Sequence, residues 1–234
     1  MLEIVVVWNN FNEASPDNFT SEHGVAVRYR TPPQDSLNEK LWPDRDYRTK
    51  AILLSDDDVY YRPADLEFAF QMWREYGQNK ITGALARCAS AGRNGEWNYN
   101  FCSPREDVYA LVLTNLAFTH IAFLDYYFSD DPSVIKVRQY VDSVFNCEDI
   151  ALNFVASSLT HSGPLLVRGW DQYVNLHPPH GISRKPGHKE VRSKCLNEFV
   201  EAFSCMPLVN STGRLERGFK HNAWYKSLLD VITS

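Results

Sequence analysis

The sequence predicts an α/β fold with a mostly parallel central sheet flanked by helices. Two observations lead to this prediction. Short apolar runs rich in β-branched residues recur along the chain. Several of them are separated by stretches whose apolar residues follow helical spacing. This alternation is typical of α/β proteins, in which helices cover both faces of the sheet and the strands read as continuous apolar runs.

The apolar runs place six strands. The first is a nearly continuous β-branched run, LEIVVVW, which we expect to be a buried parallel strand bounded by Asn9 and Asn10. The third, AILL, leads through one serine into three consecutive aspartates. The predicted strands cover Leu2–Trp8, Val25–Tyr29, Ala51–Leu54, Ile81–Leu85, Tyr109–Leu113 and Leu165–Val167.

Helical spacing places the helices. Leu66, Phe70 and Trp73 recur at this spacing, and Pro63 suits a first helical turn. A stretch rich in Pro, Gly, His and basic residues, His177–Lys189, predicts a loop. The predicted helices cover Ser36–Leu41, Pro63–Tyr76, Thr119–Tyr127, Cys147–Ser158 and Lys194–Phe203.

Size and charge restrict the class of protein. The chain has 234 residues, 44% of them hydrophobic, which is enough for a substantial core, and we expect one domain over 1–234. The net charge is −5 with no basic block, so nothing points to a nucleic-acid partner. No run of about 18 apolar residues exists, so we expect no transmembrane segment in this chain.

The acidic triplet is the strongest candidate site. Asp56, Asp57 and Asp58 follow a predicted buried strand, and ligands of parallel sheets bind beyond the carboxyl ends of the strands. Adjacent carboxylates repel one another, and a hard divalent cation such as Mg²⁺ or Mn²⁺ would relieve that repulsion. A metal held by one or two carboxylates can be completed by a diphosphate. The alternative is a solvated acidic turn, whereas an EF-hand is excluded by the ligand spacing.

Several segments together resemble glycosyltransferase family 64, the family of the exostosin C-terminal domains and exostosin-like N-acetylhexosaminyltransferases. The segment KAILLSDDDVYYRPADLEFAFQMW resembles its DxD region, NCEDIALNF its NCEDIAMNF motif, and GHKEVRSKCLNEF its C-terminal GHxxxRxxCLxxF pattern. IVVVWNN, SLNEKLWP, WNY and YALVLTNLAF are similar to family segments in the same order. The resemblance implies a GT-A fold, with a nucleotide-binding half at about 1–110 and an acceptor-side half at about 111–234.

The resemblance also implies a reaction: sugar transfer with retention of anomeric configuration, from a UDP-sugar donor and with Mn²⁺. UDP-N-acetylglucosamine is the expected donor, and GDP-mannose and UDP-galactose are alternatives. The acceptor would be a glycan or a glycolipid. A non-catalytic nucleotide- or glycan-binding relative is a further alternative. The oligomeric state stays open, with a homodimer as one option.

Site residues follow from the matching positions. Asp58 would hold the metal, and Asp149 would be the catalytic residue beside the anomeric carbon; without the resemblance Asp149 reads as a surface acid that suits a helix start. The basic residue that contacts the diphosphate has two candidates, Arg184 in a catalytic role and Lys185 beside it. The residues expected near the nucleotide are Trp8, Asn9, Asn10, Asn38, Lys40, Asp56 and Asp57.

Two positions depart from the family pattern. Lys40 replaces an Arg, so a point charge stands where a planar bidentate donor is usual. The run Thr114–Ala117 replaces Thr-Gly-Ala-Ala, a change that is expected to narrow the donor or acceptor pocket.

The five cysteines form no CxxC pair, so a zinc site is not expected, and the odd count leaves at least one thiol free. The family joins the segments of Cys147 and Cys195 by a disulfide, which the resemblance implies here. Cys88, Cys102 and Cys205 are expected to be buried or free thiols. Two N-x-Ser/Thr sequons, at Asn18 and Asn210, agree with the Golgi or endoplasmic reticulum lumen in which the family works.

Overall fold

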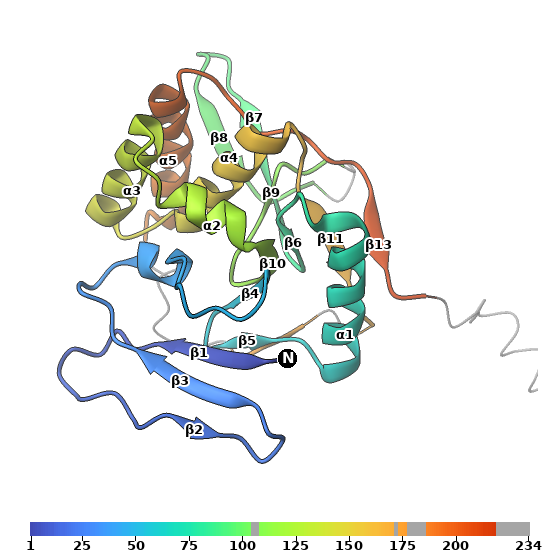
Figure 1. Cartoon of the computed structure of the whole chain (residues 1–234). Coiled ribbons are helices and arrows are strands. Elements are labelled where there is room, and N and C mark those ends of the chain that lie inside the picture. The colour runs from blue at the N-terminus through green and yellow to red at the C-terminus, as the bar shows by residue number, and fades with distance from the viewer. Residues whose placement is uncertain (104–107, 171–172, 177–185, 219–234) are drawn as a thin grey trace, which may run out of the picture.

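The computed structural model describes residues 1–103, 108–170, 173–176 and 186–218. Its centre is a five-stranded mixed sheet in the order β13-β11-β6-β10-β4 (Figure 1). β10 is antiparallel to both of its neighbours, whereas β6, β11 and β13 are parallel to one another. The strands are β4 (Ala51–Ser55), β6 (Thr82–Gly83), β10 (Leu116–His120), β11 (Leu165–Arg168) and β13 (Arg214–Glu216).

Helices cover both faces of this sheet, which confirms the predicted α/β class. α1 lies on one side, and α2 to α5 gather on the other (Figure 1). α1 continues into a single π-helical turn, η2, at Trp73–Gly77. The helices are α1 (Pro63–Met72), α2 (Ile121–Tyr127), α3 (Pro132–Val144), α4 (Glu148–Thr160) and α5 (His188–Phe203), with a short 3-10 turn, η1, at Leu37–Leu41.

The interior strand β10 separates two clusters of the core. Leu116 and Phe118 pack with Ala69 and Trp73 on the α1 side. Ala117, the residue between them, belongs to the larger cluster under α2 to α5. Successive side chains of a strand point to opposite faces, so a strand buried on both faces must be apolar throughout. This explains why the apolar runs located the strands.

Three smaller sheets complete the fold, in the orders β1-β3-β2, β8-β7-β9 and β12-β5. β5 follows the acidic triplet directly. Their strands are β1 (Glu3–Val7), β2 (Phe19–Thr20), β3 (Ala26–Arg30), β5 (Val59–Tyr60), β7 (Ala86–Ala91), β8 (Trp97–Asn100), β9 (Leu111–Val112) and β12 (Val174–Asn175).

Several predicted elements need correction. Leu2–Trp8 does form a parallel strand, but it lies in the small β1-β3-β2 sheet with Ile4 40% exposed, so it is not a buried central strand. Thr119 belongs to β10, so the following helix begins later than predicted. The last helix begins at His188 instead of Lys194, and α3 was not predicted at all.

Two disulfides link distant parts of the chain. Cys147 is bonded to Cys195, as the resemblance implied. Cys88 is bonded to Cys102, so the expectation of buried or free thiols at these two positions was wrong. Cys205 is an exposed free cysteine. Within the described ranges, no helix combines the length and the apolar character needed to cross a membrane.

Candidate active site

The acidic triplet lies at the carboxyl end of β4. Asp56 and Asp57 are exposed, and Asp58 is half-buried. The backbone amide of Asp56 donates a hydrogen bond of 2.8 Å to the carbonyl of Asn115, just before β10. The triplet is therefore held against the central sheet at the edge where α/β proteins bind ligands.

Two predicted site residues meet at this edge. The Lys40 ammonium forms an ion pair with the carboxylate of Asp56, although the two are 16 positions apart in sequence. η1 carries Lys40 to this point, and the Ser36 hydroxyl caps η1 by accepting from the amide of Asn38 at 3.0 Å. The pair neutralises one of the three crowded carboxylates, and no basic side chain of the described residues forms an ion pair with Asp57 or Asp58.

Asn38 anchors η1 to the helices behind it. Its amide nitrogen donates to the carbonyl of Arg138 at 3.0 Å and to the carboxylate of Asp142 at 2.8 Å. Its amide oxygen accepts from the hydroxyl of the fully buried Tyr127 at 2.5 Å. These partners fix the position of Lys40, two residues further on, and a direct contact of Asn38 with a nucleotide stays a prediction.

The Trp-Asn-Asn segment follows β1. The Trp8 indole donates to the carbonyl of Glu13 at 3.1 Å, and its ring meets Tyr29 edge-on at 6.0 Å between centroids. Asn9 and Asn10 are exposed in the turn that follows. Their side chains are accessible to a ligand, and their role in nucleotide binding stays a prediction.

Asp149 forms a buried ion pair that links α4 to α5. Its carboxylate accepts a hydrogen bond of 2.5 Å from the guanidinium of Arg192, and each residue is only 5% exposed. Burial is the largest single influence and acts to lower the pKa of Arg192, but the charge and hydrogen bond of Asp149, together with Tyr99 and Glu148, raise that pKa overall. Breaking such a pair would leave an unpaired buried charge, which is strongly destabilising.

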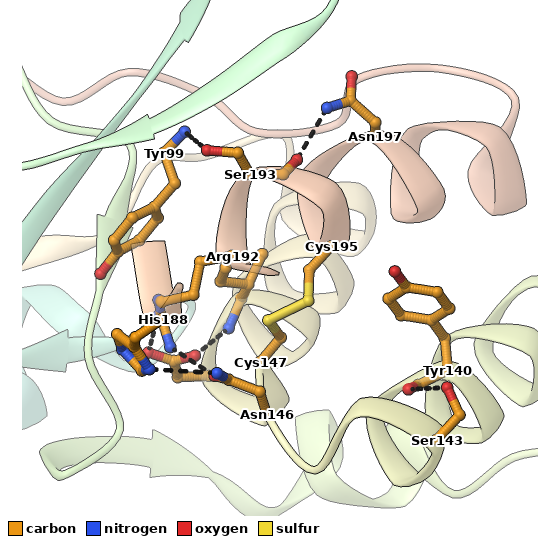
Figure 2. The surroundings of a disulfide bond; sticks show 12 residues. Tyr99, Tyr140, Ser143, Asn146, Cys147, His188, Arg192, Ser193, Cys195 and Asn197 are labelled. Carbon is orange, nitrogen blue, oxygen red and sulfur yellow. Dashed lines mark hydrogen bonds and ion pairs between the residues drawn. A yellow bond between two sulfur atoms is a disulfide. The ribbon is translucent and has the colours of Figure 1, made fainter. Parts of the chain in front are cut away.

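Further groups orient the guanidinium (Figure 2). A second nitrogen of Arg192 donates to the side-chain oxygen of Asn146 at 3.2 Å, and the guanidinium stacks over the Tyr99 ring at 4.4 Å. The side-chain nitrogen of Asn146 lies 3.2 Å from Nδ1 of His188. Burial, followed by the positive charge of Arg192, lowers the pKa of His188, so this imidazole is neutral near pH 7.

The turn before α4 is unusual in its backbone. Phe145 and Cys147 have φ angles of 48° and 79°, the left-handed region that non-glycine residues seldom adopt. The disulfide from Cys147 to Cys195 holds this turn against α5, one helical turn beyond Arg192 (Figure 2). Strained residues of this kind cluster at functional sites, because the surrounding structure must maintain them.

Charged residues of both ion pairs act on the carboxyl group of Glu148. Its pKa is raised to about 7, first by burial and then by the charge of Asp149, while Lys40 and Arg192 act in the opposite direction. Asp56 also acts on this carboxyl group. α4, which begins with Glu148 and Asp149, also contacts η1, which carries Lys40, so the two ion pairs lie on neighbouring elements.

Sequence reasoning missed part of this site. Arg192 is the Arg of the GHxxxR pattern, which was noted for its resemblance but given no role, and it is the direct partner of Asp149. Glu148 had no predicted role in the site. Arg184 and Lys185, the two candidates for the diphosphate, lie outside the described residues.

The comparison with family models identifies the class. A model described as the glycosyl transferase family 64 domain matches residues 1–219. The chain is therefore a domain of the glycosyltransferase class. Within that class, it belongs to glycosyltransferase family 64.

Its relatives differ in name and in length. An exostosin-like-3 homolog from Caenorhabditis elegans is 30% identical over 92% of this chain and 25% of its own length. A glycosylinositol phosphorylceramide mannosyl transferase 1 from Arabidopsis thaliana is 30% identical over 87% of this chain and 60% of its own. A glucosamine inositolphosphorylceramide transferase 1 from Oryza sativa subsp. japonica is 31% identical over 93% and 29%, respectively. The chain thus spans only part of these relatives.

Proposed function

We propose that this chain transfers a sugar with retention of configuration from a UDP-sugar, N-acetylglucosamine being the first candidate, to a glycan or glycolipid acceptor. One observation carries the proposal. η1, which carries Lys40 beside the acidic triplet, contacts α4, which begins at the residues of the buried Asp149–Arg192 pair. This contact supports a diphosphate-binding edge and a catalytic carboxylate within one site, as transfer from a nucleotide sugar requires.

The triplet suits a divalent cation such as Mn²⁺, with Asp58 as the protein ligand. Burial and then the charges of Asp56 and Asp57 raise the pKa of Asp58, so a nearby cation would relieve a real repulsion. In the part of the chain that the structure describes, no group of three or more His, Cys, Asp or Glu side chains converges to hold a metal. One or two carboxylates would hold the ion, whose positive charge would offset the negative charge of the departing diphosphate.

The chain's own groups would act as follows. Lys40 and Asp56 flank the nucleotide, together with Trp8, Asn9 and Asn10. The Asp149 carboxylate would lie beside the anomeric carbon of the donor, where it would orient donor and acceptor. It would also stabilise the positive charge that develops in an oxocarbenium-like transition state. Arg192 is a positioning residue that fixes the carboxylate of Asp149. The departing diphosphate accepts the proton of the acceptor hydroxyl.

The identity of the donor sugar is the part of the proposal still to be determined. Asn115 is the residue expected to influence it. The printed names of two relatives differ in the sugar, one mannosyl and the other glucosamine. Asn115 stands where the family pattern has Gly, and its carbonyl holds Asp56 in place. Its side-chain oxygen is buried and has no hydrogen-bond partner within the described residues. The change from Gly to Asn at this position favours testing mannose and galactose donors beside N-acetylglucosamine.

A donor panel tests the proposal. UDP- and GDP-sugars are incubated with the chain, with and without Mn²⁺, and nucleotide release and sugar transfer are measured. Asp58→Ala is the test variant, and Asp130→Ala, at an exposed aspartate in the turn between α2 and α3, is its matched control. We expect metal-dependent consumption of one donor that Asp58→Ala abolishes and Asp130→Ala retains. Product coupling constants in proton NMR report whether the configuration is retained.

The outcomes separate the alternatives. Consumption of a GDP-sugar or of UDP-galactose would replace the N-acetylglucosamine assignment and keep the class of reaction. Binding of UDP without consumption of any donor would mean a non-catalytic binding domain. An inverted product would remove the retaining mechanism and the role given to Asp149.

We also assign the chain to the Golgi or endoplasmic reticulum lumen. The two disulfides, Cys88–Cys102 and Cys147–Cys195, support this, because disulfides persist in oxidising compartments. The sequons at Asn18 and Asn210 agree. Glycosidase-sensitive mobility of the protein expressed in a eukaryotic cell would test it.

A further inference from the structure

The residues that follow the acidic triplet form a small two-stranded ladder. β5 pairs antiparallel with β12, so that Tyr60 lies opposite Val174 and Val59 opposite Asn175. The backbone amide of Leu176 donates to the carbonyl of Asp58 at 2.8 Å. This bond continues the register by one pair and places Leu176 opposite Asp58.

Exposure shows which side chains face outward. Along β5, Val59 is 3% exposed, Tyr60 49% and Tyr61 5%, the alternation of a strand with one buried face. Val59 and Tyr61 belong to the cluster under α1, against which Tyr173 also packs. The outward face of the ladder therefore carries the other set of side chains.

That outward face combines a carboxylate with apolar groups. Directly opposite residues of an antiparallel pair share a face, as do residues two apart on one strand. Asp58 and Tyr60 thus share the face with Val174 and Leu176. Leu176 is 61% exposed, so two large apolar side chains are accessible beside the carboxylate expected to bind the metal.

We propose that Tyr60 and Leu176 form a platform on which a sugar ring of the acceptor packs, through its apolar C–H face, beside Asp58. This rests on the proposed function. Tyr presents a flat apolar ring with a polar tip, which suits a ligand that is apolar on one face and rich in hydroxyls at its rim. Ligand sites typically combine apolar walls with a few polar groups in this way.

The position of the platform favours the acceptor, and not the nucleotide, as its ligand. Lys40 holds Asp56, at the start of the triplet, and β5 carries the chain away from that point. The platform follows Asp58 along the chain, at the opposite end of the triplet from Asp56 and its partner Lys40. Its size also argues against a membrane surface, because membrane binding grows with buried apolar area and this face offers only three apolar side chains.

Fluorine NMR tests the contact directly. The chain is labelled with 3-fluorotyrosine, and the signals of Tyr60 and Tyr76 are assigned by their loss in Tyr60→Phe and Tyr76→Phe. Tyr76 is the matched control, since it is 57% exposed but lies in η2. Methyl β-glycosides of glucose, galactose, mannose and N-acetylglucosamine are titrated in the presence of UDP and Mn²⁺. Octyl glycosides and phosphatidylcholine vesicles are titrated in parallel.

We expect at least one methyl glycoside to shift the Tyr60 signal saturably in the millimolar range and to leave the Tyr76 signal in place. A Tyr60 signal that no methyl glycoside moves overturns the proposal. Movement with octyl glycosides or vesicles alone also overturns it, because the occupant would then be an alkyl chain.

Steady-state kinetics provide a second test of the platform. They are measured with the acceptor to which the wild type transfers sugar fastest. Tyr60→Ala and Leu176→Ser should each raise the KM for the acceptor roughly tenfold, the effect of losing one apolar side-chain contact. Hydrolysis of the donor by water should keep its KM and kcat, and Tyr76→Ala should behave as wild type. A raised KM for the donor instead would place the donor sugar on the platform and contradict the proposal.

The two proposals fail in different ways. A wild type that consumes no nucleotide sugar contradicts the proposed function, whereas the NMR titration still decides whether Tyr60 binds a sugar. Normal donor consumption with an unmoved Tyr60 signal contradicts the platform alone.

Discussion

Asp149 and Arg192 carry two roles that mutation can separate. Asp149→Asn keeps the shape of the side chain but leaves Arg192 as a buried charge without its partner. We expect turnover to fall by at least 100-fold and the free energy of unfolding to fall by about 3–5 kcal/mol. Nucleotide-sugar turnover and urea unfolding measure the two effects.

The double variant Asp149→Asn with Arg192→Met is the control for stability. It removes both charges, so it should recover much of the lost unfolding free energy while remaining inactive. Near-wild-type turnover of Asp149→Asn would remove this residue from the catalytic machinery.

Glu148 gives the stability of the chain a pH dependence. Its pKa is raised from 4.5 to about 7, by burial first and then by Asp149, so the folded state binds this proton more tightly than the unfolded chain. The contribution is therefore fully present below the unfolded pKa and is lost as the pH rises through about 7. Urea unfolding at pH 5 and pH 8 should show a loss of about 1–3 kcal/mol at the higher pH that Glu148→Gln removes.

Glu201→Gln serves as the control for this measurement, since Glu201 is an exposed glutamate in α5. It should keep the pH dependence of the wild type. If Glu148→Gln and the wild type lose the same free energy between the two pH values, the buried acid responsible lies elsewhere.

At the residue scale, sequence patterns located acids better than their partners. The triplet and Asp149 were found because local motifs mark them. Arg192 lies 43 positions from Asp149, and only folding brings the two together. The pairing of Cys88 with Cys102 was missed for a related reason: it depends on the hairpin of β7 and β8, which was not predicted.

Among the helices and strands, α5 contributes two residues that hold the candidate site together. Arg192 and Cys195 lie three residues apart on α5 and bind Asp149 and Cys147, the acid and the thiol at the start of α4. Both cysteines are fully buried, unlike Cys88 and Cys102. Removal of the Cys147–Cys195 bridge should therefore damage both stability and activity.

We expect the Cys147→Ser, Cys195→Ser double variant to lose about 3–4 kcal/mol of unfolding free energy and most of its turnover. The Cys88–Cys102 bridge closes a shorter loop that contains neither Asp149 nor Arg192. The Cys88→Ser, Cys102→Ser variant should therefore retain turnover. Cys205→Ser, at the exposed free thiol, is the control and should match wild type. Equal turnover in both double variants would show that the bridge does not position the site.

Two helices, α3 and α5, show the limits of locating helices from the spacing of apolar residues. α3 was missed although Asp131 caps it through the amide of Ser133 at 2.8 Å and Pro132 begins it. Its buried residues, Val134, Val137 and Val141, do follow helical spacing. The start of α5 was placed too late because a Pro- and Gly-rich stretch precedes it, and such residues also open helices.

On the scale of the whole molecule, the two core clusters and the small β1-β3-β2 sheet should differ in stability. The clusters enclose β10 and α4, whose residues are largely buried, whereas β1 is only partly buried. Hydrogen exchange followed by mass spectrometry should show faster exchange for peptides of β1 and β3 than for those of β10 and α4. Equal protection across all four elements would mean that the molecule opens only as one unit.

The α/β class followed from the sequence because a sheet covered on both faces imposes continuous apolar runs. The exception was β1, whose β-branched run is equally apolar but lies in the small outer sheet. Apolar character predicts that a segment is a strand. Which sheet it joins depends on pairings with distant segments, and no local pattern encodes them.

The order in which a ribosome makes this chain gives the α4–α5 connection a further consequence. Asp149 and Cys147 emerge more than 40 residues before Arg192 and Cys195. Until α5 has left the exit tunnel, the nascent polypeptide carries an unpaired acid and an unpaired thiol. A stalled or prematurely released product therefore lacks both the disulfide and the counter-charge, and the proposed transfer would begin only after α5 has been synthesised.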